Sequence, residues 1–210
     1  MNLADLIEKR RHVGREFLVW LWFESEIFEG RFEVPGFGPC ELWLEGQMSL
    51  TLDKEQSRLK GAAPSATAEA HEALRQGKLP AQARVRLTRG ELAFAFLFTA
   101  DTLALSAVKI PDVVKDESDE RFYERMYLVE DLERMLGALY SRFVALRLCT
   151  VWDSAVVPAI RAWVHDQTVD VAAYQRARAS ALPIGYAGRS KTTPPPALDA
   201  DAPRGAALVA

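Results

Sequence analysis

The side chains best suited to chemistry in this sequence are basic ones, and they gather in one segment of the chain. Residues 58–89 contain seven Lys and Arg against two acids, a local net charge of +5, whereas residues 1–57 and 112–136 each carry −5. Phosphate groups bind such a local concentration of cations, because each contact releases condensed counterions and acids beyond about 10 Å are screened by salt. The candidate phosphate contacts are Arg58, Lys60, Arg75, Lys78, Arg84, Arg86 and Arg89.

Part of this basic segment has the period of a β-strand. In RVRLT (84–88), cationic and apolar side chains alternate, which predicts a strand with one apolar and one cationic face. The cationic face has two interpretations: a phosphate-binding surface, or a solvated strand whose charges prevent edge-to-edge aggregation. The alternation taken alone favours the second.

No combination of residues in the sequence is typical of a catalytic or metal site. His12, His71 and His165 all lie among helix-forming residues, and His71 lacks the second histidine of a zinc-protease helix, because position 75 is Arg. There is no glycine-rich phosphate loop and no nucleophile elbow. The acidic residues between 116 and 120 suit a solvated helix start better than a metal site. We therefore expect a protein that is not an enzyme and that binds no cofactor or metal.

The cysteines and the N-terminal segment bear on the cellular compartment. Cys40 and Cys149 have no CxxC spacing, so we expect reduced thiols that behave as small buried hydrophobes. The first dozen residues mix acids, bases and apolar side chains and lack the order of a signal peptide. The apolar run at 17–23 is far shorter than the roughly 20 residues that span a bilayer. These features predict a cytoplasmic protein without a membrane segment.

The elements around the basic segment predict an α+β fold. A chain of 210 residues that is 49% hydrophobic can bury one substantial core, and we expect a single domain over residues 1–170. Residues 171–210 are rich in Pro and Ala and are predicted to form a largely disordered tail. Helices are predicted at 2–28 with a break or kink at Gly14, at 65–77 with Ser65 as N-cap, at 122–146 and at 153–165. Strands are predicted at 30–34 and 41–52, followed by an antiparallel meander at 83–88, 91–98 and 101–108.

Aromatic residues indicate how these elements pack. The run at 17–23 is apolar nearly all round its helix, so we expect it to be covered on both sides. The strand at 91–98 has apolar residues on both faces, Phe94, Phe96 and Phe98 on one of them, which predicts a central strand covered on both faces. The apolar stripe of the helix at 122–146 should pack with the N-terminal aromatic helix against the sheet. The predicted interface residues are Trp20, Trp22, Met126 and Leu136.

Several segments resemble the C-terminal part of RdgC-like recombination-associated proteins. They are GREFLVWLWFESE (14–26), the block from ATAEAHEALRQGKLP to FTADTLALSAVKIP (66–111) and ERMYLVEDLERMLGALYSRF (124–143), in the same order as in that family. The resemblance covers roughly residues 12–147. It implies a non-enzymatic, dimeric, ring-shaped binder of double-stranded DNA with little sequence preference, which modulates RecA-driven recombination. It also implies that Lys78, Arg84, Arg86 and Arg89 contact phosphate.

Two departures from the family bear on this expectation. Full-length members carry a further N-terminal region that this sequence does not include, so the resemblance does not imply a closed ring. The sequence pI of about 5.7 is low for a DNA-binding protein.

Two functional hypotheses follow. The first is sequence-independent binding of double-stranded DNA in recombination control, by a nucleoid-associated homodimer that meets recombination proteins and no membrane. The alternative is a protein-interaction or assembly module of the same fold that does not bind DNA, in which the aromatic helix and the stripe at 122–146 form the interface.

Overall fold

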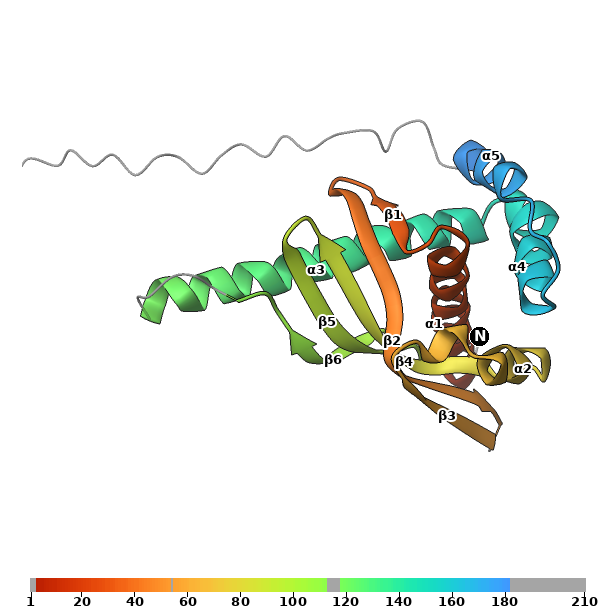
Figure 1. Ribbon diagram of the computed structural model, residues 1–210, viewed down its shortest axis with the longest axis horizontal. Coiled ribbons are helices and arrows are strands. Elements are labelled where there is room, and N and C mark those ends of the chain that lie inside the picture. The colour runs from red at the N-terminus through yellow and green to blue at the C-terminus, as the bar shows by residue number, and fades with distance from the viewer. Residues whose placement is uncertain (1–2, 54, 113–117, 182–210) are drawn as a thin grey trace, which may run out of the picture.

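Six antiparallel strands form one sheet in the computed structural model, which describes residues 3–53, 55–112 and 118–181 (Figure 1). The strands are β1 (Arg31–Val34), β2 (Gly38–Leu52), β3 (Glu55–Gly61), β4 (Leu79–Arg89), β5 (Leu92–Thr99) and β6 (Ala104–Lys109). Their order is β1-β2-β4-β5-β6, and β3 also pairs with β2. Together with the helices on one face, this sheet confirms the predicted α+β fold and its antiparallel meander, which is β4, β5 and β6.

The long strand β2 organises the sheet because it pairs with three others. One edge of β2 pairs with β4, and the other edge pairs first with β1 and then with β3. The register with β4 shifts between Leu44 and Met48, where Gly46 has a φ of +78°. Glycine adopts this conformation without strain, so the strand bulges and bends at this point. β3 was not predicted from the sequence, because EQSRLKG contains a single large apolar residue, Leu59.

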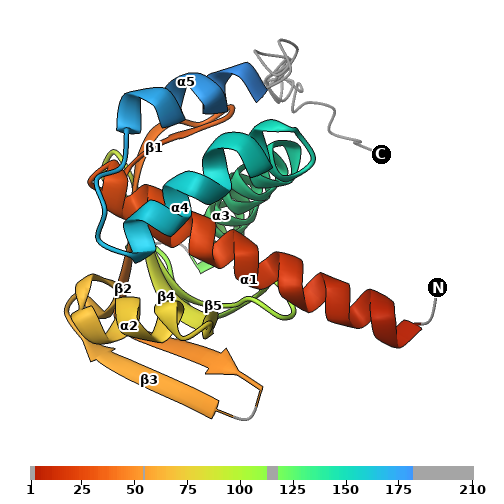
Figure 2. The same ribbon diagram turned by 90° about the vertical axis from the view of Figure 1, so that its right-hand side faces the viewer.

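The helices cover one face of the sheet. They are α1 (Leu3–Ile27), α2 (Ala68–Arg75), α3 (Ser118–Arg147), α4 (Val157–Val164) and α5 (Val171–Ala181), with a 3-10 turn η1 (Pro64–Ala66) and a π-helical turn η2 (Trp152–Val156). In Figure 1, α3 passes behind the strands and its N-terminal end projects beyond them. Figure 2 shows α4 lying across α1.

The length and hydropathy of the described helices determine whether any of them could cross a membrane. Within the described residues no single helix is long and apolar enough to cross a membrane. The bent pair Asp119–Arg147 and Trp152–Val164, at 91°, meets the limits of length and composition together, as core helices of water-soluble proteins also do.

The helix predicted at 65–77 begins later and has a different cap. Thr67 caps α2, since its hydroxyl accepts a hydrogen bond from the N–H of Ala70. Ser65 is buried instead, and its hydroxyl donates to the carbonyl oxygen of Leu44 at 3.1 Å. Ser65 therefore fixes η1 to β2 and does not cap a helix.

Helix α1 is continuous, so the predicted break at Gly14 is wrong. At Gly14, α1 closely approaches the backbone just after β5: a Cβ on this residue would lie 1.9 Å from the carbonyl oxygen of Ala100. The next residue, Arg15, makes a bidentate ion pair with Asp101, at 2.7 and 3.1 Å. The glycine is present because a side chain would separate α1 from the end of β5.

The aromatic run of α1 forms the centre of the core. Trp20 and Trp22 are completely buried, so the prediction that they form an intermolecular interface is wrong. They contact the protein's own helices: Trp20 packs on Phe143 of α3, and Trp22 packs edge-on against Trp163 of α4. Leu136 is also buried. The expected cover on both sides of α1 is present, and this chain supplies it.

The folded region extends beyond residue 170, where the disordered tail was predicted to begin. Residues 171–181 form α5, whose Tyr174 is buried against Phe23. The hydroxyl of Tyr174 donates to Glu24 of α1 at 2.7 Å, and Arg178 pairs with the same carboxylate at 2.7 Å. These contacts explain why a short, polar segment is helical. The rest of the predicted tail, residues 182–210, lies outside the described residues.

Candidate nucleic-acid interface

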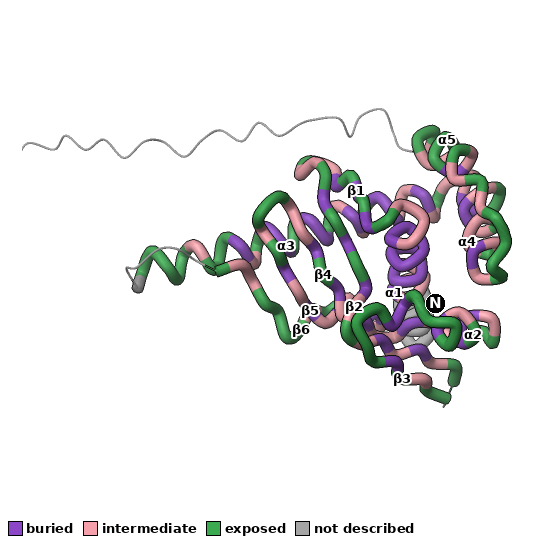
Figure 3. The backbone as a smooth tube through the Cα atoms, viewed as in Figure 1, coloured by how far each residue is buried: buried purple, intermediate pink, exposed green. Residues whose placement is uncertain are grey.

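One face of the sheet is open. In β5 the phenylalanines at 94, 96 and 98 are buried beneath the helices, whereas Ala93 is exposed and Ala95 and Leu97 are half-buried. Figure 3 shows the same alternation of buried and more exposed positions along the strands. The prediction that β5 is covered on both faces is therefore wrong, because all the described helices pack on the phenylalanine side.

Strand register determines which side chains share the open face. Residues opposite each other in neighbouring strands point to the same side of a sheet. One row across four strands contains Trp43, Arg86, Ala95 and Lys109. Further rows contain Arg84 beside Leu97, and Arg58 beside Ser49 and Gln82.

Six cations therefore lie on this face. Arg31 of β1, opposite Glu41, is paired with Glu29, and the other five are Arg58, Lys60, Arg84, Arg86 and Lys109. No ion pair joins any of the five to another described residue. The same alternation brings three carboxylates to the open side, Glu33 of β1 and Glu41 and Glu45 of β2. The face is thus positively charged although the whole chain has a net charge of −3.

The position of β4 argues against the interpretation that its arginines protect a sheet edge from aggregation. β4 lies between β2 and β5, so Arg84 and Arg86 do not protect an edge of the sheet. Arg84 instead lies along the bulge of β2: a Cβ on Gly46 would be 3.0 Å from its Cδ. Edge protection remains a sufficient reason for Arg58 and Lys60, since β3 pairs with β2 alone.

The other three predicted phosphate contacts have structural partners elsewhere. Arg75 donates to the carbonyl oxygen of Val164 at 2.8 Å and pairs with Asp166, which joins α2 to α4. Lys78 donates to Ser57 at 3.2 Å and lies 3.4 Å from a carboxylate oxygen of Glu55. Arg89 pairs with the buried carboxylate of Asp131 on α3 at 2.5 Å. The structure thus separates these three cations from the open face and gives them roles in joining elements.

A shallow groove of about 270 Å³ crosses the open face near β3. Its polar lining combines two cations with three amides and a hydroxyl, namely Arg58, Lys60, Gln47, Gln56, Gln82 and Ser49. Amides can donate and accept hydrogen bonds, and the cations can bind anions. The groove is therefore suited to a ligand that is both polar and negatively charged.

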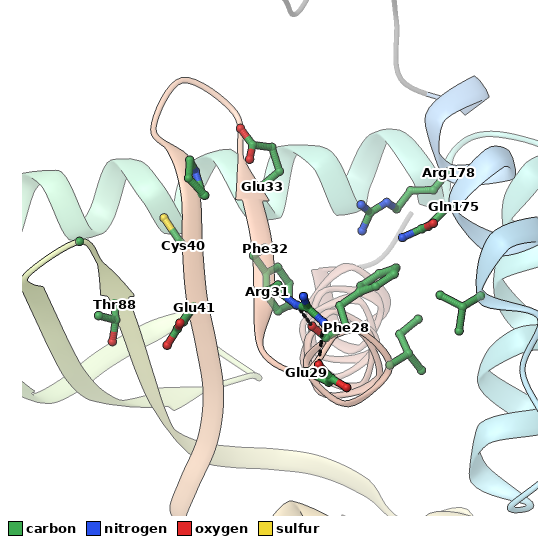
Figure 4. Close-up of a pocket in the computed structure, with 14 residues that line it drawn as sticks. Phe28, Glu29, Arg31, Phe32, Glu33, Cys40, Glu41, Thr88, Gln175 and Arg178 are labelled. Atoms are coloured by element: carbon green, nitrogen blue, oxygen red, sulfur yellow. Dashed lines mark hydrogen bonds and ion pairs between the residues drawn. The ribbon is translucent and has the colours of Figure 1, made fainter.

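A larger hollow of about 830 Å³ lies between the end of α1, the strands β1 and β2, and α5 (Figure 4). Its arginines are already paired, Arg31 with Glu29 at 2.6 Å and Arg178 with Glu24. Burial raises the pKa of the Cys40 thiol at its wall, which opposes formation of a nucleophilic thiolate. No group of three His, Cys, Asp or Glu among the described residues could hold a metal ion. Besides the paired residues and this thiol, the lining carries the carboxylates of Glu33 and Glu41.

Sequence reasoning missed three residues of the open face, Trp43, Lys109 and Gln82. For Trp43 the signal was available, because it alternates with the buried Leu42 and Leu44 along a single strand. Gln82 and Lys109 are placed on the open face by their register with neighbouring strands, which the sequence pattern does not give.

Searches of this chain against protein-family models, curated proteins and solved structures found no match.

Proposed function

We propose that this protein binds double-stranded DNA through its phosphate backbone, without sequence preference and without catalysing a reaction. The observation that carries the proposal is the group of five cations on the open face, none of them paired with another described residue. The resemblance to RdgC-like proteins supports the further proposal that binding serves recombination control in the nucleoid, in company with recombination proteins.

The shape of the open face supports backbone contacts over base recognition. Neighbouring strands are about 4.8 Å apart, so the cations of β3, β4 and β6 are spread across a wide and shallow surface. Reading bases in the major groove requires a helix or a two-stranded ribbon that enters it. Arg84 and Arg86 lie in the middle of a sheet and cannot enter a groove in this way. Contacts limited to phosphates position DNA but carry no sequence information.

The double variant Arg84→Ala/Arg86→Ala tests this proposal. If each arginine contacts one phosphate, the slope of log affinity against log salt should become shallower by about 1.8, since each contact contributes about 0.9. Affinity should fall equally for unrelated duplex sequences. The measurement is fluorescence anisotropy of labelled random-sequence duplexes over a series of salt concentrations.

The matched control removes the same charge elsewhere. Arg161→Ala/Arg176→Ala replaces two exposed arginines of α4 and α5, which lie off the open face. We expect this control to keep the wild-type slope. A β4 variant that keeps the wild-type affinity and slope, or a control that loses as much, would contradict the proposal.

A second candidate function is protein interaction through α3, and a specific observation favours it. Four large apolar side chains on the projecting end of α3 are each 54–68% exposed, which are Phe122, Tyr123, Met126 and Tyr127. Figure 3 shows that this end of α3 is largely exposed. Contiguous apolar patches of this kind commonly mark interaction sites. We propose a second copy of this chain as the partner.

A Met126→Asp variant tests self-association. A charge in the middle of an apolar interface costs several kcal/mol unless it is paired, so a dimeric wild-type protein should become monomeric. The measurement is solution mass by sedimentation or light scattering over a concentration series. Leu148→Asp is the control, because Leu148 is 82% exposed but directly follows the opposite end of α3. A wild-type protein that is monomeric throughout the series would refute this candidate.

A further inference from the structure

The open face also carries an exposed tryptophan, Trp43. Trp43 is 41% exposed, whereas the other four tryptophans of the chain are at most 7% exposed. Indole rings carry a large apolar area, and they are enriched where proteins bind ligands or partners. The indole lies between Glu41 and Glu45 along β2 and across from Arg86. An apolar ring in such a charged surface needs an explanation that phosphate binding does not supply.

The ring of Trp43 is held in place by the backbone. It lies against Gly30, where a Cβ would be only 2.3 Å from the ring carbon Cε2 and 2.6 Å from the ring nitrogen Nε1. Gly30 has a φ of +75°, a conformation that favours glycine. Contact with a backbone that cannot carry a side chain fixes the indole, while much of its surface stays open. A fixed aromatic ring loses little conformational entropy when a ligand stacks on it.

We infer that Trp43 stacks on an unpaired base and that the open face binds single-stranded DNA. This inference rests on the proposed function, because the same cations would hold the phosphates. Aromatic side chains beside a cationic track are the usual means of binding single strands without sequence preference. Arg86 lies directly across from Trp43, and Lys109 lies two strands further along the same row. A base on Trp43 therefore places its own backbone beside Arg86.

The groove continues this path along β4. From Arg86 the cationic side chains lead past Arg84 to Gln82, which lines the groove together with Arg58 and Lys60. Beside these arginines on β5, Ala95 lies opposite Arg86 and Leu97 lies opposite Arg84. These two half-buried side chains form an apolar floor. Bases of a single strand can lie on such a floor and hydrogen-bond to the amides of the groove.

A duplex cannot make the Trp43 contact without distortion. Its bases are paired and stacked on one another, and exposing the face of one base requires unstacking that costs a few kcal/mol. Single strands offer base faces at no such cost. Trp43 should therefore contribute to single-strand binding and contribute little to duplex binding.

The test compares Trp43→Ala and Trp43→Phe with the wild-type protein. Labelled oligothymidylate and a labelled random-sequence duplex of equal length serve as probes in fluorescence anisotropy. We expect Trp43→Ala to weaken oligothymidylate binding by about 5- to 150-fold, the range that base stacking on an aromatic ring spans, and to change duplex binding by less than twofold. Trp43→Phe should retain most of the single-strand affinity, because it keeps an aromatic face.

Intrinsic fluorescence gives a second, independent readout. The other tryptophans are buried, so quenching of the wild-type protein by oligothymidylate should come from Trp43 and disappear in Trp43→Phe even though binding persists. Circular dichroism and thermal unfolding establish that each variant is folded. Because Trp43 is on the surface, its removal leaves no core cavity.

The outcomes separate this inference from the proposed function. Equal effects of Trp43→Ala on both probes, or no effect on oligothymidylate, overturn the inference, while duplex binding that depends on Arg84 and Arg86 still supports the proposed function. Oligothymidylate binding that depends on Trp43, in a protein that does not bind duplex, supports the inference and refutes duplex binding. A protein that binds neither probe refutes both.

Discussion

A Glu24→Ala variant is expected to lose about 3–5 kcal/mol of unfolding free energy, the usual cost of removing one partner of a buried ion pair. Glu24 is completely buried in α1, where its carboxylate accepts hydrogen bonds from the hydroxyl of Tyr174 and from Arg178, each at 2.7 Å. Without Glu24, Arg178 keeps a charge that is only 18% exposed and has lost its counter-ion. Chemical denaturation followed by circular dichroism measures the loss.

The neighbours of Glu24 increase this cost. Arg142 is also buried; desolvation lowers its pKa first of all, and the positive charge of Arg178 lowers it further, whereas Glu24 opposes the shift. The pKa of Tyr174 is raised by burial and then by the negative charge of Glu24, so its hydroxyl stays protonated and can donate. One carboxylate thus compensates two guanidinium groups and orients a phenol. Its removal breaks the two contacts with Tyr174 and Arg178 and also takes away the negative charge that offsets the burial of Arg142.

Two further variants identify the cause of the expected loss. Glu24→Gln keeps an acceptor for Tyr174 but removes the charge, so its loss should be smaller than that of Glu24→Ala. The double variant Glu24→Gln/Arg178→Met should be more stable than the sum of its single losses predicts, since it leaves no unpaired charge at this position. Additive losses would mean that Glu24 and Arg178 act independently and that the buried pair is not what holds α5 to α1.

Local periodicity in the sequence predicted the features that depend only on neighbouring residues along the chain, namely which strand face is polar and which helix is covered all round. The alternation in RVRLT placed Arg84 and Arg86 on a polar strand face, and the apolar run of α1 indicated that this helix is covered all round. The partners that cover it are more than a hundred residues away, such as Phe143 and Trp163. Composition alone cannot distinguish cover by the same chain from cover by a second one. That is why Trp20 and Trp22 were assigned to an interface.

For a similar reason, only four of the seven predicted phosphate contacts lie on the open face. Arg75, Lys78 and Arg89 have the same local charge as the four that stayed on the open face, but their partners lie at Asp166, Glu55 and Asp131. Sequence separations of 91 and 42 residues for the two arginine pairs put such contacts beyond any pattern of spacing. Local charge density predicted a cationic surface, and strand register decided which cations belong to it.

Helix α3 illustrates the same limit within one element. Its apolar stripe has a single period from Phe122 to Leu146, yet Phe122 and Met126 are exposed whereas Leu139 and Leu146 are completely buried. The period is a property of the sequence, but burial depends on where the sheet ends. The exposed half of the stripe is therefore the part that the proposed self-association would bury.

A Gly14→Ala variant is expected to be destabilised by about 3 kcal/mol, at the upper end of the usual cost of overpacking a core. The added Cβ would lie 1.9 Å from the oxygen and 2.9 Å from the carbon of the Ala100 carbonyl, and backbone atoms cannot rotate away as a side chain can. Helix α1 would have to move from the sheet, which would pull Arg15 from Asp101. The melting temperature and denaturant midpoint should both fall.

The same substitution at Gly137 is the matched control and should have the opposite sign. Gly137 lies inside α3, and a Cβ there would meet no atom within 4 Å. Alanine is favoured over glycine in helices by up to about 1 kcal/mol, so Gly137→Ala should stabilise the protein. If both variants were stabilised, helix propensity would dominate at each site and the close contact between α1 and Ala100 would be refuted. Opposite signs would show that Gly14 is needed for the approach of α1 to the sheet, and hence for the position of the aromatic core behind the open face.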